Sequence, residues 1–244
     1  MSVLAQWKKA WAMLQVRQLR VGAWSCPLCR GLIHLRLAAD ETAVRCIRCG
    51  ASAITQSIAK VIGDEYPSLG SLAVCELSSR GTLVEWLSKH AGSLTTSEYV
   101  AGGVPGEFYD GVRCENVEHL TYADASFDLC TSTEVFEHVR DDAAGFGEIR
   151  RVLKPGGKCI FTVPMSEKRE TVERVRVDGA VLTHLLPPEY HRDPFRMHGQ
   201  VLCMRNYGYD IADRLLHAGF SSARIVHTHA RMMGYARPVI LATR

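Results

Sequence analysis

Four of the nine cysteines fall into two Cys-x-x-Cys pairs separated by sixteen residues. The pairs are Cys26 with Cys29 and Cys46 with Cys49. Each such turn presents two thiolates on one side, and tetrahedral Zn²⁺ needs four soft donors about 2.3 Å from one point. The segments Leu32–Leu37 and Thr42–Arg45 between the pairs suit the two strands of a zinc ribbon. We therefore predict one zinc ion on the four thiolates, structural because no coordination position stays open.

Two disulfides, or free buried thiols, are the alternative interpretation of the same cysteines. Disulfides persist in oxidising compartments, and the N-terminal segment lacks the apolar core and cleavage site of a secretory signal. With an odd cysteine count, this favours a reducing, cytoplasmic location and therefore zinc. The role of the module stays open among folding support, contact with a second copy of the chain, and capture of a substrate.

A second group of polar residues directly follows an apolar run, in the sequence Glu76-Leu-Ser-Ser-Arg-Gly-Thr82. The run Leu72–Leu77 predicts a buried strand, and Thr82–His90 predicts the helix after the turn. In an α/β sheet a ligand binds beyond the carboxyl ends of the strands, where the strand order reverses. Because small residues let the backbone approach a ligand closely, this turn is a candidate cofactor site.

The remaining apolar runs supply the elements that must position these groups. Strands and helices alternate, which predicts a mostly parallel sheet with helices on both faces. Further strands are expected at Ser93–Thr96, Phe127–Ser132, Lys158–Val163 and Val239–Thr243, and further helices at Ala143–Leu153 and Asn206–His217. We divide the chain into an N-terminal unit (1–23) with an amphipathic helix at 2–20, a zinc ribbon (24–56) and an α/β domain (57–244).

Size and charge narrow the classes of function. The 244 residues, 47% hydrophobic, can bury the core of one α/β domain with a small appendage. A net charge of +3 gives no electrostatic case for nucleic acid, and no apolar run is long enough to predict a transmembrane helix. We expect the tryptophan side of the 2–20 helix to pack on its own chain or on a second copy, as in a homodimer; a membrane surface is the alternative.

Three ordered blocks then carry a family resemblance. Asn116-Val-Glu-His-Leu-Thr-Tyr-Ala-Asp-Ala-Ser-Phe-Asp-Leu129 is followed by Thr133-Glu-Val-Phe-Glu-His-Val139 and by Glu148-Ile-Arg-Arg-Val-Leu-Lys-Pro-Gly-Gly-Lys158. In type and order these blocks resemble the class I, type 11-like methyltransferases that act on small molecules with S-adenosylmethionine. The resemblance is close over roughly 70–164. It implies a Rossmann-like, seven-stranded sheet with S-adenosylmethionine at the turn after Glu76.

The resemblance also implies a role for individual residues. Glu76 would lie near the methionine end of the cofactor, and Ser78 and Gly81 would shape the turn beside its methionine and ribose. Glu98 would accept hydrogen bonds from the ribose hydroxyls, because a carboxylate suits a vicinal diol. The residues implied at the adenine and at the boundary with the substrate are Asn116, Val117 and Thr133.

The turn departs from the usual family pattern of acidic-x-Gly-x-Gly-x-Gly. Here only Gly81 is a glycine, and Arg80 would either pair with the carboxylate of the cofactor or block its close approach. The departure leaves a scaffold protein with this fold, without tight cofactor binding, as an alternative to an enzyme.

The segment 166–205 follows the last parallel strand, where such an insertion usually covers the substrate. Methyl transfer to a hydroxyl requires a base, and His191 is the first candidate and His138 the second, because the pKa of histidine lies near neutrality. Tyr190 and Glu189 would orient the substrate. Arginines in this segment suggest an anionic acceptor or pair with local acids; they are Arg192, Arg196 and Arg205.

These observations favour methyl transfer to oxygen of a small-molecule acceptor, such as a sugar or glycan precursor. Methylation of an rRNA or tRNA base is the alternative among enzymes, since some such enzymes also carry a four-cysteine module. The weak net charge speaks against it.

Overall fold

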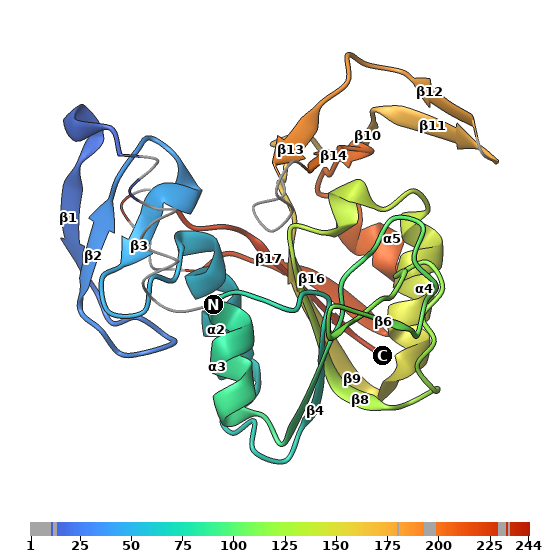
Figure 1. The fold of residues 1–244 in the computed structure, drawn as a ribbon, viewed down its shortest axis with the longest axis horizontal. Helices are drawn as coiled ribbons and strands as arrows, with labels where there is room; N and C mark the ends of the chain where they lie inside the picture. The colour runs from blue at the N-terminus through green and yellow to red at the C-terminus, as the bar shows by residue number, and fades with distance from the viewer. Residues whose placement is uncertain (1–10, 12–13, 180, 193–198, 229–232, 234) are drawn as a thin grey trace.

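The computed structural model describes residues 11, 14–179, 181–192, 199–228, 233 and 235–244. Its centre is one twisted sheet with helices on both faces, and a small three-stranded sheet lies at one side (Figure 1). This arrangement matches the predicted α/β class with an N-terminal cysteine module. None of the helices in the described part of the chain is long and apolar enough to cross a bilayer.

The central sheet has the strand order β16-β17-β9-β8-β4-β5. Its strands are β16 (Ser222–Val226), β17 (Val239–Thr243), β9 (Leu153–Thr162), β8 (Phe127–Thr133), β4 (Ala73–Glu76) and β5 (Ser93–Thr96). The pairs from β9 to β5 are parallel, whereas β17 is antiparallel to both of its neighbours. The chain therefore steps from β4 outward to β5 and then back across β4 to β8, which makes the β4–β8 boundary the switch point of the sheet.

The sheet has six strands, one fewer than the resemblance implies. Beyond β5, the described chain makes a single parallel bridge between Glu98 and Cys114. The residues just before Cys114 pair with each other instead, in the hairpin β6 (Phe108–Tyr109) and β7 (Val112–Arg113). This local pairing leaves only the bridge where a seventh strand would run.

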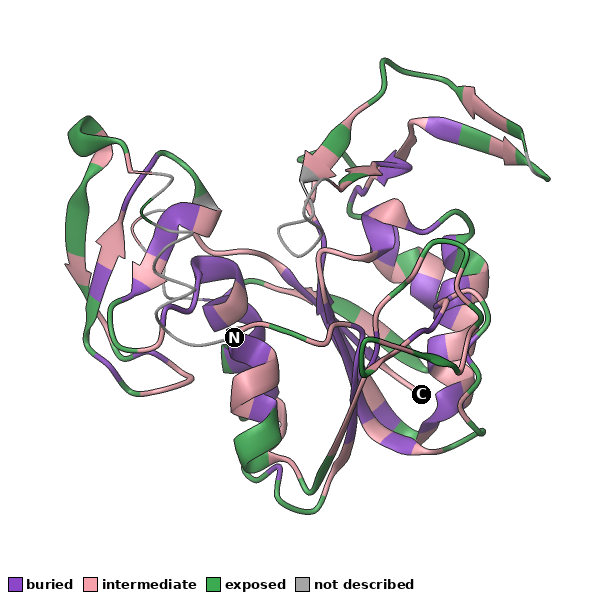
Figure 2. Cartoon of the chain, viewed as in Figure 1, coloured by how far each residue is buried: buried purple, intermediate pink, exposed green. Residues whose placement is uncertain are grey.

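Alternating residues of the parallel strands face two apolar cores. Val74, Leu129 and Ile160 pack beneath α2 (Ala53–Glu65) and α3 (Thr82–His90). The neighbouring residues Cys75, Cys130 and Cys159 pack on the opposite face, beneath α4 (Asp142–Val152) and α5 (Ile211–His217). Because side chains alternate across a strand, each strand fills both cores, and the buried residues concentrate along the sheet (Figure 2).

Two of the four α-helices in the described part of the chain begin at a residue whose side chain caps the helix. The Ser52 hydroxyl accepts a 3.2 Å bond from Thr55 N at the start of α2, and the Asp141 carboxylate accepts a 3.0 Å bond from Ala144 N at the start of α4. The predicted Asn206–His217 helix begins five residues late, at Ile211, because Asn206 pairs with Val172 in a short sheet. Otherwise the predicted helices and strands of the domain agree with the structure to within a residue or two at most ends.

The cysteine module is a three-stranded antiparallel sheet. Its strands are β1 (Arg20–Ala23), β2 (Ile33–Arg36) and β3 (Val44–Cys46). The predicted helix over 2–20 is wrong at its C-terminal end, because Val16–Gln18 form a single 3₁₀ turn and Arg20 pairs with Arg36 in the sheet. Residues 1–10, 12 and 13 of that prediction lie outside the described residues. The sheet of the module therefore begins at Arg20, before the predicted boundary at residue 24.

The segment 166–205 forms three two-stranded antiparallel sheets beside the carboxyl end of β9 (Figure 1). They pair β10 (Val172–Glu173) with β15 (Arg205–Asn206), β11 (Val175–Asp178) with β12 (Val181–His184), and β13 (Tyr190–Arg192) with β14 (Gln200–Leu202). The described parts of the segment thus form short two-stranded ribbons attached to the domain, with the β11–β12 hairpin projecting farthest (Figure 1).

Candidate functional site

The four predicted cysteines converge on one point. Their Sγ atoms lie within 4.8 Å of one another, with 3.7 Å between those of Cys26 and Cys49 and 3.6 Å between those of Cys29 and Cys46. Four thiolates about 2.3 Å from a tetrahedral Zn²⁺ lie about 3.8 Å apart, whereas disulfide sulfurs are about 2.05 Å apart. The cluster therefore fits a zinc-ribbon-like module and does not fit two disulfides.

A close backbone approach supports this geometry. The Gly31 N–H points to the Cys29 sulfur at 3.3 Å. A Cβ added at Gly31 would lie 3.2 Å from the sulfurs of both Cys29 and Cys46 and 2.9 Å from Arg48 Cβ. Glycine is needed here because a side chain would press on the donor atoms of the cluster.

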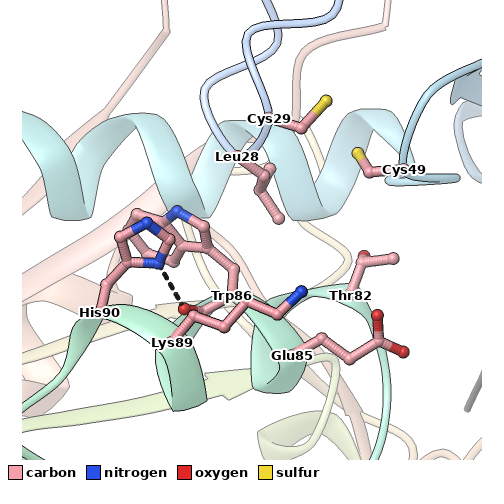
Figure 3. Close-up of a pocket in the computed structure, with 8 residues that line it drawn as sticks. All are labelled: Leu28, Cys29, Cys49, Thr82, Glu85, Trp86, Lys89 and His90. Atoms are coloured by element: carbon pink, nitrogen blue, oxygen red, sulfur yellow. Dashed lines mark hydrogen bonds between the residues drawn. The ribbon is translucent and has the colours of Figure 1, made fainter.

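The cluster faces α3, the helix that begins at the candidate cofactor turn, across a pocket. A small pocket separates Leu28, Cys29 and Cys49 of the module from the side of α3, as Figure 3 shows. The α3 residues that line it are Thr82, Glu85, Trp86, Lys89 and His90. The ring Nδ1–H of His90 donates a 2.7 Å bond to Trp86 O and so fixes the last turn of the helix. The module is thus in a position to support α3.

The candidate cofactor turn lies at the switch point, where β4 ends at Glu76. Gly81 precedes the first residue of α3 with φ of +116°, and a Cβ added there would meet no atom within 4 Å. The left-handed backbone requires glycine, and the space in front of it is open. The helix N-terminus and this open backbone can accept the polar part of a ligand.

Glu98 reaches the same turn from the end of β5. Its Oε1 accepts hydrogen bonds from Ser79 N at 2.9 Å, from Ser79 Oγ at 3.0 Å and from Ser78 Oγ at 3.5 Å. The serines that replace the usual glycines therefore tie the acidic residue to the turn. The Arg80 side chain is exposed, and the Arg80 backbone N–H donates a hydrogen bond to the Ser78 hydroxyl.

Glu76 is fully enclosed between β4 and β8. It is 1% exposed, and its Oε2 accepts a short hydrogen bond from the Thr131 hydroxyl. Burial raises the pKa of this carboxyl from 4.5 to about 7, against the lowering effect of the Thr131 bond. Glu76 therefore holds its proton to a higher pH than a solvent-exposed carboxyl does.

The residues implied at the adenine lie in a turn beyond the β4–β5 edge. Asn116 Oδ1 accepts a 3.1 Å bond from Glu118 N, and the 116–119 turn closes through His119 N to Asn116 O at 2.9 Å. Val117 is 8% exposed and packs in the core beneath α4. Thr133 ends β8, next to the switch point. The structure thus gathers Glu76, the 78–81 turn and the last residue of β8 at one edge of the sheet.

The two candidate bases, His138 and His191, lie together although they are far apart in sequence. Their rings meet edge to face with centroids 4.9 Å apart. His138 belongs to the 3₁₀ helix η3 (Phe136–His138) that follows β8, and His191 belongs to β13. Glu137 Oε1 lies 3.6 Å from His138 Nε2 and 3.8 Å from His191 Nδ1. The nearby carboxylates of Glu137 and Glu189 raise the pKa of His191 despite its partial burial.

The other residues predicted to contact the substrate differ in their exposure. Tyr190 is 50% exposed on β13. Arg205, suggested for an anionic acceptor, is 4% exposed and already paired: Nε donates to Glu173 at 3.1 Å, and Nη1 donates to Val139 O at 2.6 Å. It is a structural ion pair that fastens the hairpins to η3. Arg196 and the side chain of Arg192 lie outside the described part.

Sequence reasoning gave no role to Glu137 or Thr131, two of the residues that build this site. Glu137 is 1% exposed between the two histidines, Glu189 bonds His191 Nε2 at 3.3 Å, and Thr131 bonds Glu76. The sequence signal for Glu137 was present, since it adjoins His138 in the block that carries the family resemblance. Glu189 was suggested only for orienting a substrate.

Known proteins that match this chain in sequence are methyltransferases. Residues 78–161 match the family model described as "Methyltransferase domain". The resemblance expected from the sequence blocks is confirmed. The demethylmenaquinone methyltransferase of Corynebacterium kroppenstedtii is 34% identical over 97 residues, 38% of this chain and 39% of its own length. The malonyl-[acyl-carrier protein] O-methyltransferase of a Methylovorus species is 33% identical over 110 residues, 45% of this chain and 31% of its own length.

These matches span less than half of each curated relative. A solved structure shares the fold more widely: that of an S-adenosylmethionine-dependent methyltransferase from Listeria monocytogenes has a TM-score of 0.51 at 12% identity. The alignment covers 78% of this chain and 97% of the Listeria one. The fold is thus that of class I methyltransferases.

Proposed function

We propose that this protein transfers the methyl group of S-adenosylmethionine to a small molecule. The observation that carries the proposal is the convergence of Glu98, the 78–81 turn and Glu76 at the switch point of the sheet. There the open backbone at Gly81 lies in the same turn as Ser79, whose N–H fixes Oε1 of the Glu98 carboxylate. A preorganised carboxylate and an accessible helix start suit the ribose and methionine parts of such a cofactor.

The acceptor would lie beneath the 166–205 hairpins, and its reacting atom would be an oxygen. The Glu137, His138 and His191 side chains gather there, at the same edge of the sheet as Thr133. A hydroxyl must lose its proton as it attacks the methyl carbon, and this cluster is the nearest polar group of the site able to assist. A sugar or glycan precursor offers such hydroxyls. Exposed Tyr190 would line the entrance.

We also propose that the four-cysteine cluster binds a structural Zn²⁺. Sulfur separations of 3.6 and 3.7 Å agree with a tetrahedral site. Because Leu28 of the module packs against the apolar core beneath α3, the metal would help to hold in place the helix whose start forms the cofactor turn. Folding support is thus the role that we favour for the module.

Isothermal titration of S-adenosylhomocysteine into zinc-loaded protein tests the cofactor site. We expect micromolar binding, and a loss of at least tenfold in affinity for Glu98→Ala, because the carboxylate that would accept the ribose hydroxyls is removed. Asp213→Ala, exposed on α5, is the matched control and should bind like the unmodified protein. Equal affinity in the Glu98 and Asp213 variants would refute the assignment of Glu98 to the cofactor.

A further inference from the structure

We infer that Glu137, His138 and His191 form a binding site for one divalent transition-metal ion. The ligand atoms are Glu137 Oε1, His138 Nε2 and His191 Nδ1. The meaning of the site for catalysis rests on the proposed function, whereas metal binding itself does not. Two histidines and one carboxylate with open positions are a donor set for Fe²⁺, Mn²⁺, Co²⁺ or Zn²⁺.

The first observation is a buried carboxylate without a hydrogen-bond partner. Glu137 is 1% exposed, and neither of its side-chain oxygens has a hydrogen bond within the described structure. Burying an ionised carboxylate is costly unless it is paired or coordinates a metal. The backbone of Glu137 is held in place, because Glu137 O accepts a 2.7 Å bond from Met204 N. The side chain therefore faces the two histidines without an alternative partner among the described residues.

The second observation is the tautomer of His138. Its Nδ1 lies 2.9 Å from Leu202 O. A carbonyl oxygen can only accept, so Nδ1 carries the proton and donates. In the neutral ring, Nε2 then offers a lone pair, and this atom is the one that lies 3.6 Å from Glu137 Oε1. Two acceptors thus face each other, which requires a positive charge or a proton between them.

His191 repeats this arrangement from another strand. Its Nε2 lies 3.3 Å from the Glu189 carboxylate, and its Nδ1 lies 3.8 Å from Glu137 Oε1. If Nε2–H donates to Glu189, the Nδ1 lone pair is directed at Glu137. A carboxylate or carbonyl behind each ligating histidine is the usual outer shell of a metal site. Here Leu202 O and Glu189 supply it for the two rings.

The distances among the three ligand atoms are close to those around a coordinated ion. Ligands about 2.1 Å from one ion lie about 3.0–3.4 Å apart in octahedral or tetrahedral geometry, and the three ligand atoms here lie within 4.8 Å of one another. The separations of 3.6 and 3.8 Å are a few tenths of an ångström longer than those around one ion, and they also exceed the length of a hydrogen bond. A small inward rotation of the side chains would complete the coordination.

A competing group, Glu189 with His191 and Cys203, also has its ligand atoms within 4.8 Å. Its members already have other partners. Glu189 Oε2 pairs with Arg174 Nη1 at 3.1 Å, and the Cys203 thiol donates to Arg205 O at 3.2 Å. The Glu137 site has the unpartnered carboxylate and is therefore the one that we assign.

Three protein ligands leave coordination positions open for an acceptor oxygen. Coordination lowers the pKa of a bound hydroxyl. The oxygen then forms its bond to the methyl carbon while the bond from that carbon to the sulfonium breaks. The cofactor leaves as the neutral thioether, and the hydroxyl proton passes to water. This deepens the proposed function: the acceptor is a hydroxyl compound that can bind a metal ion, and a vicinal diol would bind through two oxygens.

Metal binding can be measured without methyl transfer. Protein that holds one zinc ion per chain, on the four cysteines, is dialysed against Mn²⁺ or Co²⁺, and bound metal is counted by elemental analysis. We expect one Mn²⁺ or Co²⁺ per chain in addition to the zinc. Glu137→Gln and His191→Gln should each weaken this binding at least tenfold. The matched controls Asp178→Asn and His184→Gln, exposed on the β11–β12 hairpin, should bind as the unmodified protein does.

Thermal melts and S-adenosylhomocysteine titrations of each variant show that it is folded. If a glutamine variant fails to fold, the metal count of the unmodified protein and of Cys203→Ser still decides. Binding of neither ion to the unmodified protein overturns the site, as does unchanged binding in a folded Glu137→Gln. Loss of binding in Cys203→Ser transfers the site to the competing group and also overturns it. Metal binding without S-adenosylhomocysteine binding would refute the proposed function and leave the metal site standing.

Discussion

Glu76 gives the most quantitative prediction, because one buried carboxyl is held between two central strands. It is 1% exposed, and burial raises its pKa from 4.5 to about 7. Between these two values the folded protein holds a proton that the unfolded chain has released. Stability from this group is therefore fully present below pH 4.5 and is lost as pH rises to about 7. Glu76→Gln replaces the carboxyl with a neutral amide of similar shape and removes this dependence.

The size of the effect follows from the shift. The rise of the Glu76 pKa from 4.5 to about 7 corresponds to a stabilising free energy of about 3 kcal/mol, at ~1.36 kcal/mol for each tenfold change in proton affinity. No discount for solvent screening applies, since the side chain is enclosed. Integrating between the two pKa values, roughly 2.5 kcal/mol of this falls between pH 5 and pH 8. The free energy of unfolding of the unmodified protein should therefore decline by that amount relative to the Glu76→Gln variant.

Urea unfolding at four pH values from 5 to 8, at one zinc concentration, measures the difference. Groups other than Glu76 titrate in both proteins and cancel in the comparison. Thr131→Val, which removes the hydrogen bond to Glu76, should raise the pKa further and shift the decline to higher pH. A difference between the unmodified protein and Glu76→Gln that stays constant within about 0.5 kcal/mol would mean that Glu76 titrates as in the unfolded chain. The reasoning from burial would then be refuted.

Two other predictions concern how the site is held. Arg205→Ala should destabilise the protein by about 1–3 kcal/mol, because it removes the buried hydrogen bond to Val139 O, while Glu173 keeps its pair with Arg214; thermal melts check this, and a loss below about 0.5 kcal/mol would exclude a structural role. Cys49→Ser should lower zinc content below one per chain and weaken S-adenosylhomocysteine binding if the module supports α3, as we propose; Cys114→Ser, a cysteine outside the cluster, is the control. Full cofactor affinity in zinc-free protein would show that the module does not support the cofactor turn.

The sequence was sufficient for the parts of the molecule that depend on local pattern. The apolar run Leu72–Leu77 became β4, and the two Cys-x-x-Cys turns converged as their spacing required. Each of these features is contained in a few neighbouring residues. The predicted 2–20 helix failed at its end because Arg20 found a strand partner in Arg36, which intrinsic helix preference cannot foresee.

Burial and long-range pairing explain what the sequence could not supply. Arg205 looked like a ligand for an anion, yet Glu173 and the carbonyl of Val139 occupy its guanidinium. Glu98 was assigned to a ribose, and the structure adds that Ser79 binds its Oε1. From the sequence alone, the serines of the turn were only a departure from the glycines of the family, because nothing in the linear sequence links residue 79 to residue 98.

The histidine cluster shows most clearly why fold was needed to interpret chemistry. His138 ends the 3₁₀ helix η3 that comes after β8, while His191 comes 53 residues later, and the register of one small sheet brings them together. In that sheet His191 pairs with Val201, and the next residue, Leu202, supplies the carbonyl that fixes the His138 tautomer. A shift of one residue would turn His191 to the opposite face and move the carbonyl from His138. The same strand pairing thus positions the His191 ring and orients the His138 ring. The buried carboxylate of Glu137 between them completes the metal site that we propose.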